Sequence, residues 1–332
     1  MAPSKHCGFY NKDVQCFAIA ALQMGLSVQD FKNFLQDPRT SEYLNCEGRL
    51  YRELRRLSLS TKTEDPGAVI DIVSAGNPTK YNDKRQHDAG EFYEVMMDKL
   101  KEEFNLEGQQ IIDTLIQTSV ELLRTCCECG FEDDPVTEQV YFHKIPANRK
   151  TMEENFKANF ETIEQEKRCP NKGCKSTKCQ VQRKITRAPP VLAILLQRFE
   201  RVKNTLVCRK INKAINTPTI FIPDLENPAM FNLKCSVIHK GSVSGGHYFC
   251  YIHHPGGKMT RCNDADCQDV VSGREMATAG RELQQAYLLL YFQGNLEDEE
   301  VCTLSGLTQS THINYIFCPG ARRKKYRKYR GE

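Results

Sequence analysis

The stretch GFYNKDVQCF at residues 8–17 offers a candidate nucleophile, Cys16, at the head of an Ala-rich run. The stretch GGHY at residues 245–248 offers a candidate base, His247, far downstream. Thiol hydrolases take this sequence form, because their cysteine and histidine meet only in the folded chain. The two glycines before the histidine are expected to leave space for an incoming polypeptide tail. The two stretches together therefore indicate a thiol hydrolase.

Cys16 is expected to begin a buried helix. Residues 16–24, CFAIAALQM, are mostly apolar, and Gly25 is expected to end the helix. At a helix N-terminus, the exposed backbone N–H groups and the helix dipole favour a thiolate. Ser27 followed by Asp30 predicts the capped start of a second helix, which stops before the next proline.

The rest of the chain changes from a helical pattern to a strand pattern. Four apolar residues recur at every fourth position and predict an amphipathic helix in the segment that opens at residue 86: Phe92, Met96, Leu100 and Phe104. Further on, short runs rich in Val, Ile and aromatic residues predict strands at residues 191–196, 231–238, 248–252 and 287–292. Helices first and strands later indicate an α+β fold.

Six segments, in this order, match the sequence boxes of one protein family: residues 8–23, 86–92, 190–199, 239–248, 263–264 and 286–291. In the first box the matching residues are Gly8, Asn11, Cys16, Leu22 and Gln23. The chain thus resembles the ubiquitin-specific protease family of cysteine deubiquitinases, over residues 8–293. Any one box would be a weak signal, but six boxes in the right order are a strong one.

The resemblance implies a papain-like α+β cysteine protease fold with a thumb, a palm and an inserted zinc-bearing β extension, the fingers. We expect a catalytic domain at residues 1–294, with the fingers insertion near residues 120–185, and a C-terminal extension at residues 295–332. The implied reaction is hydrolysis of the bond between the C-terminal glycine of ubiquitin and a substrate lysine. The implied partners are ubiquitin and ubiquitinated proteins.

The resemblance also assigns roles to five residues. Cys16 is the nucleophile, His247 is its general base, and Asn263 orients the imidazole, with Asp264 beside it. Asn11, five residues before the nucleophile, donates its side-chain amide to the developing oxyanion.

The chain departs from the family pattern at residues 13–15, which read Asp-Val-Gln in place of Gly-Asn-Thr. If residue 13 required a positive φ, Asp would be a poorer substitute for Gly, and Val14 would resist such a conformation. Two alternatives to a deubiquitinase therefore stay open: a catalytically impaired ubiquitin-binding pseudoenzyme, and a protease for a ubiquitin-like modifier. Retention of the nucleophile, the base and the residue that orients it argues against the pseudoenzyme.

Two cysteine pairs form a candidate zinc site: Cys126, Cys129, Cys169 and Cys174. Each pair can supply half of a tetrahedral Zn²⁺ site, and two hairpin tips of the fingers can bring the pairs together. Cys127 and Cys179 are alternative ligands. Four thiolates leave no open position for water, so the zinc would be structural. No organic cofactor is expected.

Composition bounds the class of protein and its location. The 332 residues are 40% hydrophobic, which suffices for an ordinary buried core. The sequence has no apolar run of about 18 residues and no secretory signal at its start, so we expect an intracellular protein of the cytoplasm or nucleus without membrane insertion. The 16 cysteines then indicate thiols and metal ligands rather than a disulfide scaffold.

A basic tail dominates the net charge. The chain carries +4, but residues 322–332 hold seven Lys or Arg and one acid, so the remaining chain is mildly acidic. The tail is compatible with binding to nucleic acid or to a nuclear import factor, although runs of like charge are most often merely solvated.

Overall fold

The fold comes from a computed structural model, which describes residues 6–75, 81, 83–186, 190–202, 208–223, 229–243 and 245–294. The chain divides into two units, Met1–Leu296 and Glu297–Glu332, and every described residue lies in the first. The basic tail therefore lies outside the described residues, and the limits of the catalytic domain stay a prediction. Within the described part of the chain, no helix has the length and apolar character needed to span a membrane.

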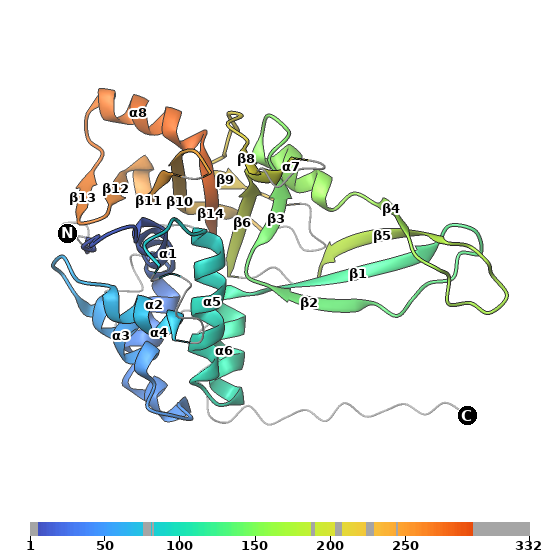
Figure 1. Cartoon of the computed structure of the whole chain (residues 1–332), viewed down its shortest axis with the longest axis horizontal. Coiled ribbons are helices and arrows are strands. Elements are labelled where there is room, and N and C mark those ends of the chain that lie inside the picture. The colour runs from blue at the N-terminus through green and yellow to red at the C-terminus, as the bar shows by residue number, and fades with distance from the viewer. Residues whose placement is uncertain are drawn as a thin grey trace. The chain divides into compact units, whose positions relative to one another are not determined.

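Helices dominate the N-terminal part of the first unit (Figure 1). They are α1 (Cys16–Leu26), α2 (Gln29–Gln36), the 3-10 helix η1 (Pro38–Tyr43), α3 (Arg49–Leu59), α4 (Gly67–Ser74), α5 (Ala89–Glu102) and α6 (Leu106–Ile116). Every residue of α1 is buried, and this helix packs against α5 and against the strand β11 (Gly246–His253). α5 confirms the predicted amphipathic helix, and its first turn is capped by the side chain of Asp88.

The first two helices correct the predicted boundary between them. α1 does not end at Gly25 but runs one residue further, to Leu26, and Gly25 packs against the ring of Tyr93. A Cβ at Gly25 would lie 3.3 Å from that ring. Ser27 caps the end of α1, donating its hydroxyl to Met24 O at 2.7 Å, so the predicted helix start at Ser27 is wrong. Val28 occupies the N-cap of α2 without a side-chain hydrogen bond.

An eight-stranded sheet forms the body of the C-terminal part, in the order β13-β12-β11-β10-β14-β6-β3, with β9 paired to β10. The strands are β3 (His143–Pro146), β6 (Val191–Gln197), β9 (Ile220–Phe221), β10 (Phe231–Gly241), β11, β12 (Met259–Asn263), β13 (Asp266–Asp269) and β14 (Ala286–Gln293). The four predicted strands are confirmed as β6, β10, β11 and β14. Among the strands that the structure describes, β3 and β6 form the one parallel pair. A large apolar core packs on this sheet and includes residues from β6, β10, β11 and β14.

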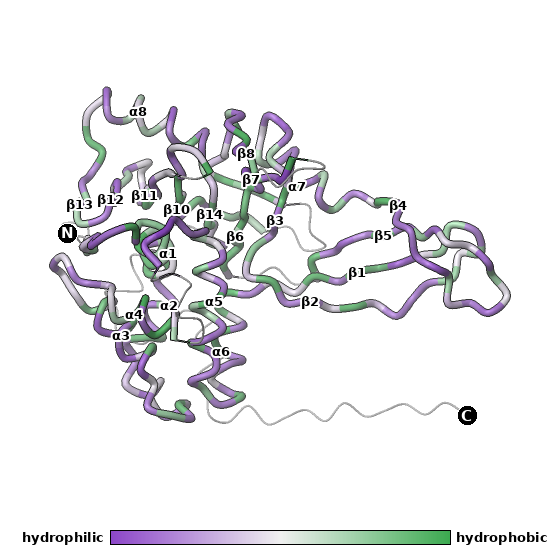
Figure 2. The backbone as a smooth tube through the Cα atoms, viewed as in Figure 1, coloured by the Kyte–Doolittle hydropathy of each residue, from purple (hydrophilic) through white to green (hydrophobic). Residues whose placement is uncertain are grey.

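A second, four-stranded sheet has the order β2-β1-β5-β4 and extends away from the helices (Figure 1). Its strands are β1 (Thr118–Cys126), β2 (Val136–Val140), β4 (Ile163–Glu166) and β5 (Lys178–Ile185). Between β2 and β4 the chain returns to the main sheet through β3 and α7 (Met152–Asn159). Figure 2 shows that β5 is largely hydrophilic, whereas β6 of the main sheet is hydrophobic.

The remaining elements are short and lie near the main sheet: the hairpin β7 (Phe199–Arg201) and β8 (Cys208–Lys210), the 3-10 helix η2 (Pro255–Gly257) and α8 (Gly273–Leu283). Helices and antiparallel strands are thus segregated along the chain, and the α+β class predicted from the sequence is confirmed.

Candidate active site and cysteine cluster

Cys16 is the first residue of α1 and is 2% exposed. Its thiol donates a weak hydrogen bond to Gln86 Oε1 at 3.7 Å. Because the whole of α1 is buried, the position of the sulfur is fixed by the packing of a rigid element rather than by a loop. The backbone N–H groups of the first helical turn lie directly after the thiol, as the sequence predicts.

His247 lies on β11, opposite Lys240 of β10, and approaches Asn263 at the end of β12. Its Nε2 is 2.5 Å from Asn263 Oδ1. Because an amide oxygen only accepts, Nε2 donates this bond, and Nδ1 is left to exchange a proton with Cys16. A hydrogen bond with the thiol of Cys16, together with the bond to Asn263, raises the pKa of His247 to about 9 against the opposing effect of burial.

Asn11 and Asp264 join the same group of side chains. Asn11 Nδ2 donates to Asp264 Oδ2 at 3.1 Å, and Asn11 Oδ1 accepts from the backbone N–H of Gln15 at 3.1 Å. Asp264 Oδ2 is also 3.9 Å from His247 Nε2. The amide nitrogen of Asn11 carries two hydrogens, so its bond to Asp264 leaves one of them for another acceptor. The structure therefore brings all five residues chosen from the sequence to one place, including Cys16.

The turn at residues 13–15 is free of the strain expected from its departure from the family pattern. Neither Asp13 nor Val14 is among the described non-glycine residues with a positive φ, so neither is forced into the left-handed region. Gln15 closes the turn, because its Oε1 accepts from the backbone N–H of Lys12 at 3.4 Å. Asp264 has a φ of 54° and occupies the tight turn between β12 and β13.

Two glycines of the site allow close packing within the protein. A Cβ on Gly8 would lie 2.2 Å from the carbonyl oxygen of Ala265, and a Cβ on Gly246 would lie 2.2 Å from Nε2 of His239. Gly245, in contrast, faces open space. The expectation that both glycines before His247 make room for a polypeptide tail is therefore corrected for Gly246, whose neighbour is a buried ring.

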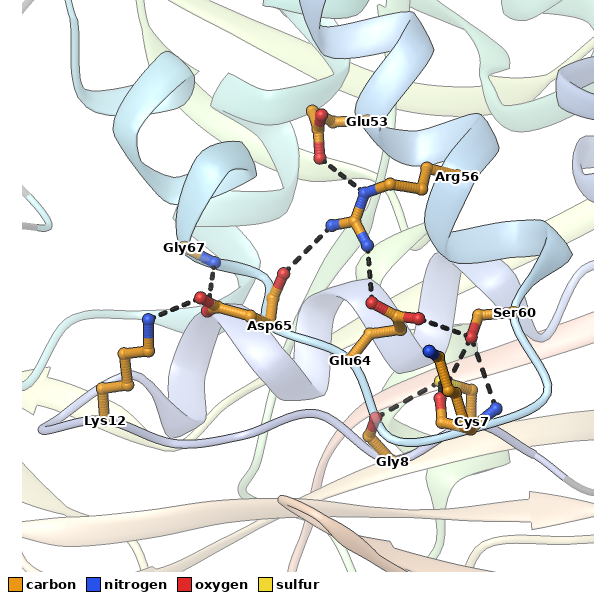
Figure 3. A network of polar contacts seen from close by, with 10 residues as sticks. Cys7, Gly8, Lys12, Glu53, Arg56, Ser60, Glu64, Asp65 and Gly67 are labelled. Carbon is orange, nitrogen blue, oxygen red and sulfur yellow. Dashed lines mark hydrogen bonds and ion pairs between the residues drawn. The ribbon is translucent and has the colours of Figure 1, made fainter.

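A polar network that sequence patterns do not reveal holds the segment before Asn11 (Figure 3). The backbone carbonyl of Glu64 accepts from the N–H of Tyr10 at 2.9 Å, and the backbone N–H of Glu64 donates to Gly8 O at 3.0 Å. Arg56 in turn binds the Glu64 carboxylate at 2.6 Å and the Asp65 carbonyl at 3.1 Å. Glu64 and Asp65 lie in a polar loop with no periodic pattern, and Arg56 lies on the exposed side of α3, so no sequence signal links them to the candidate active site.

The four candidate metal ligands lie together at one end of the four-stranded sheet. The Sγ atoms of Cys126, Cys129, Cys169 and Cys174 all lie within 4.8 Å of one another. The Cys126–Cys174 and Cys129–Cys169 sulfur pairs are 3.8 and 3.7 Å apart. A tetrahedral zinc with Zn–S bonds of 2.3 Å would place its sulfurs about 3.8 Å apart. The cluster therefore has the dimensions of a four-thiolate metal site.

The surroundings of the cluster act on its thiols in opposite directions. Burial raises the pKa of Cys169 to about 12. Backbone N–H groups of Cys129 and Glu128 donate to the sulfur of Cys126 and lower its pKa to about 6. Asn171 Nδ2 lies 3.8 Å from Cys129 Sγ. The alternative ligands Cys127 and Cys179 fall outside the four-cysteine group.

Comparison with known proteins extends the resemblance seen in the sequence. A family model described as ubiquitin carboxyl-terminal hydrolase matches residues 7–291. Ubiquitin carboxyl-terminal hydrolase 42 of Homo sapiens is 24% identical, over 92% of this chain and 24% of that protein. Ubiquitin carboxyl-terminal hydrolase 7 of Caenorhabditis elegans is 23% identical, over 88% of this chain and 28% of that protein. The chain thus spans about a quarter of the length of these curated relatives.

A solved structure shares the fold. The SAGA DUB module with Ubp8, Sgf11, Sus1 and Sgf73 bound to ubiquitin aldehyde matches with a TM-score of 0.72 and 20% identity. The match covers 89% of this chain and 71% of that chain. At this identity it bears on the fold alone, and it confirms the expected α+β protease architecture. Since the family model matches the chain from residue 7 to residue 291, the protein belongs to the ubiquitin carboxyl-terminal hydrolase family.

Proposed function

We propose that the chain is a cysteine-type deubiquitinase, which hydrolyses the bond between the C-terminal glycine of ubiquitin and a substrate lysine. The observation that carries the proposal is the bond of 2.5 Å between His247 Nε2 and Asn263 Oδ1, with Cys16 at the other side of the imidazole. This is the thiol form of the nucleophile, base and orienting residue that acyl-transfer enzymes share. Family membership supports the same reaction.

In the proposed mechanism, Cys16 and His247 act as an ion pair. The thiolate attacks the carbonyl carbon of the C-terminal glycine, and the imidazolium gives its proton to the leaving lysine amine. Water then hydrolyses the thioester with the imidazole as base. The raised pKa of His247 keeps the imidazolium available at neutral pH.

Asn263, Asp264 and Asn11 have supporting roles in the proposal. Asn263 holds the imidazole through Nε2, and Asp264 holds the amide of Asn11 through its bond of 3.1 Å. The second amide hydrogen of Asn11 and the backbone N–H of Cys16 are the proposed donors to the oxyanion. Removing one such donor commonly lowers the rate about 10²–10³-fold.

The cysteine cluster has a structural role in the proposal. Cys126, Cys129, Cys169 and Cys174 would hold Zn²⁺, whose charge would keep the four thiolates together and join β1 to the loop before β5. The zinc needs no open position for water or substrate, because the proposed reaction takes place at Cys16.

The proposed partners are ubiquitin and ubiquitinated proteins, and the proposed location is the cytoplasm or nucleus. The module that contains Ubp8 is bound to ubiquitin aldehyde, which supports ubiquitin as the partner here. The proposed contact of the basic tail with nucleic acid or an import factor concerns residues outside the described part of the chain and stays a sequence prediction.

Hydrolysis of C-terminal fluorogenic derivatives of ubiquitin and of ubiquitin-like modifiers tests this function. We expect turnover of the ubiquitin derivative alone, no turnover by Cys16→Ser, and unchanged turnover by the control Cys46→Ser, which removes an exposed thiol. Turnover of a ubiquitin-like modifier instead of ubiquitin would show that this modifier is the substrate, and it would contradict the proposal. Tight ubiquitin binding without turnover would identify a pseudoenzyme and contradict the proposal.

A further inference from the structure

A row of thiols crosses the strands that carry His247 and Asn263. Cys250 of β11 lies opposite Cys262 of β12, and Cys262 lies opposite Cys267 of β13. All three thiols are free. Cys250 and Cys262 are buried, whereas Cys267 is half-buried and is the thiol that solvent can reach.

The hairpin geometry brings Cys262 and Cys267 close enough for a disulfide. β12 and β13 are joined by the two-residue turn Asp264–Ala265, so the pair next to the turn, Asn263 and Asp266, is the hydrogen-bonded one. Cys262 and Cys267 are then a non-hydrogen-bonded pair, whose Cα atoms lie about 4.5 Å apart. Disulfides span Cα separations of about 4.4–6.8 Å.

We propose that Cys262 and Cys267 are a redox-sensitive dithiol, which oxidised glutathione converts to a disulfide and which then displaces Asn263 and lowers activity. The effect on activity rests on the deubiquitinase function proposed above, but formation of the disulfide does not. The pair lies outside the group of side chains that would carry out hydrolysis.

The reaction balances as two thiol–disulfide exchanges. The thiolate of Cys267 attacks oxidised glutathione, forms a mixed disulfide and releases one glutathione thiol. Cys262 then attacks the sulfur of Cys267, the protein disulfide forms, and the second glutathione leaves. The protein loses two electrons and two protons, and the glutathione disulfide gains them. The hydrogen bond to Cys262 and burial raise the pKa of Cys267, so the first attack is the slow step. Hydrogen bonds from Cys250 and Cys267 lower the pKa of Cys262, which favours the second attack.

The disulfide would act on Asn263 because the dithiol directly flanks the turn. Asn263 follows Cys262, and its opposite residue, Asp266, precedes Cys267. The turn has little room to adapt, because Asp264 O accepts from the N–H of Phe9 at 2.9 Å. Disulfides favour a Cα separation of about 5.5–6 Å, so the bond would push the two strands apart beside the turn. That movement would shift the bond between Asn263 and the imidazole, and a misplacement of 1 Å in a catalytic group can cost about 10²-fold in rate.

Peptide mass spectrometry tests the dithiol without any substrate. Trypsin releases residues 262–274 as one peptide that holds both cysteines, because the flanking cleavage sites are Arg261 and Arg274. After the full chain is incubated with oxidised glutathione, we expect this peptide to lose two hydrogen atoms and to regain them with dithiothreitol. A peptide that stays reduced, or that is cross-linked to the peptide of Cys250, would overturn the proposal.

The effect on activity is tested with the same samples. We expect oxidation to lower hydrolysis of the ubiquitin derivative about 10- to 100-fold and dithiothreitol to restore it. Cys267→Ser and Cys267→Ala, checked for folding by circular dichroism, should keep full activity under oxidation. Equal inhibition of these variants would show that oxidation acts at Cys16 and would overturn the proposed switch. A reduced wild-type protein that is inactive from the start would instead count against the proposed function.

Discussion

The two sheets of this protein are held together in different ways. The eight-stranded sheet packs on a large apolar core, which Val120 and Ile185 at one end of the four-stranded sheet also join. Beyond these two residues, the described strands of the four-stranded sheet share a cluster of three buried residues, Leu122, Cys179 and Val181. The edge strands β2 and β4 are exposed along almost their whole length. The main sheet can therefore fix its geometry by burial, but the four-stranded sheet needs a further constraint.

Along β1, the packing changes from burial in the main core to a cluster of thiols. Val120, near its start, belongs to the main core, Leu122 belongs to the small cluster, and Cys126, at its end, belongs to the group of four thiols. The candidate active site lies on the elements that burial holds, where distances of a few tenths of an ångström matter. The candidate zinc site lies where the apolar core ends.

Arg198→Ala should produce the largest loss of stability, because it disrupts the packing of the eight-stranded sheet. This side chain is fully buried and donates to four backbone carbonyls, those of Ala286, Ile211, Lys213 and Gln284. Its loss leaves those carbonyls without a donor, so we expect a cost of about 3–5 kcal/mol in the free energy of unfolding. Urea unfolding measures it, and Arg209→Ala, at an exposed arginine, is the matched control. Equal losses of stability in the two variants would contradict the claim that the buried hydrogen bonds of Arg198 hold the main sheet.

Asn263→Ala should lower kcat/KM about 10²-fold, with little change in stability, because it frees the imidazole of His247. The bond between Asn263 and His247 also predicts how activity depends on pH. The pKa of His247 is raised to about 9, so wild-type activity should hold at neutral pH and fall as the pH rises through 9.

Loss of the Asn263 bond removes one cause of the raised pKa, so the alkaline fall should begin at a lower pH in the variant. Asn263→Asp, which keeps the acceptor and adds a negative charge, should move the alkaline fall back to a pH at least as high as in the wild type. The free energy of unfolding should change with pH in the same direction. The imidazolium stabilises the fold in full below the ordinary pKa of histidine, and this stabilisation is lost as the pH rises towards 9. An unchanged pH profile in Asn263→Ala would remove Asn263 from the proposed mechanism.

Cys126→Ser should loosen the four-stranded sheet while sparing the body. We expect loss of bound zinc and amide exchange in β1 and β5 that is faster by at least about tenfold, the change produced by ~1.4 kcal/mol. Alkylation of Cys16 by small reagents should stay near normal. Cys127→Ser is the matched control, since this neighbouring thiol is exposed and lies outside the cluster. Finding no zinc in carefully purified wild-type protein would contradict the metal proposal.

Lys12→Ala should have the smallest effect, although it lies beside the candidate active site. Its ion pair with Asp65 measures 2.5 Å, but the two side chains are 61% and 45% exposed. Exposed pairs of this kind contribute about 0–1 kcal/mol. We expect a change within about 0.5 kcal/mol in thermal unfolding, whereas a larger loss would show that charge rather than burial holds residues 8–12.

Sequence patterns predict the parts of this protein that depend on local order. The start of α1 at Cys16 and the strand with His247 follow from apolar patterns, and the cysteine spacing selects four thiols that lie together. The end of α1 is not predictable in this way, because Gly25 is a buried helical residue packed against Tyr93 rather than the residue that ends the helix. Contacts between distant segments decide such positions.

Two further features lie beyond sequence patterns for the same reason. β12, which carries Asn263, is only five residues long and too short for a reliable period. The role of Gly246 depends on the ring of His239, which reaches it from the neighbouring strand. The support of residues 8–10 likewise depends on Glu64, which lies in a loop without a sequence pattern, and on Arg56, which binds it from α3.

Mass spectrometry of the protein mixed with ubiquitin that carries an electrophile at its C-terminus tests the central claim most directly. The account predicts one covalent adduct on the wild-type chain, located at Cys16, and none on Cys16→Ser. An adduct at another cysteine, or ubiquitin binding without any adduct, would contradict the assignment of Cys16, His247 and Asn263 as the catalytic group.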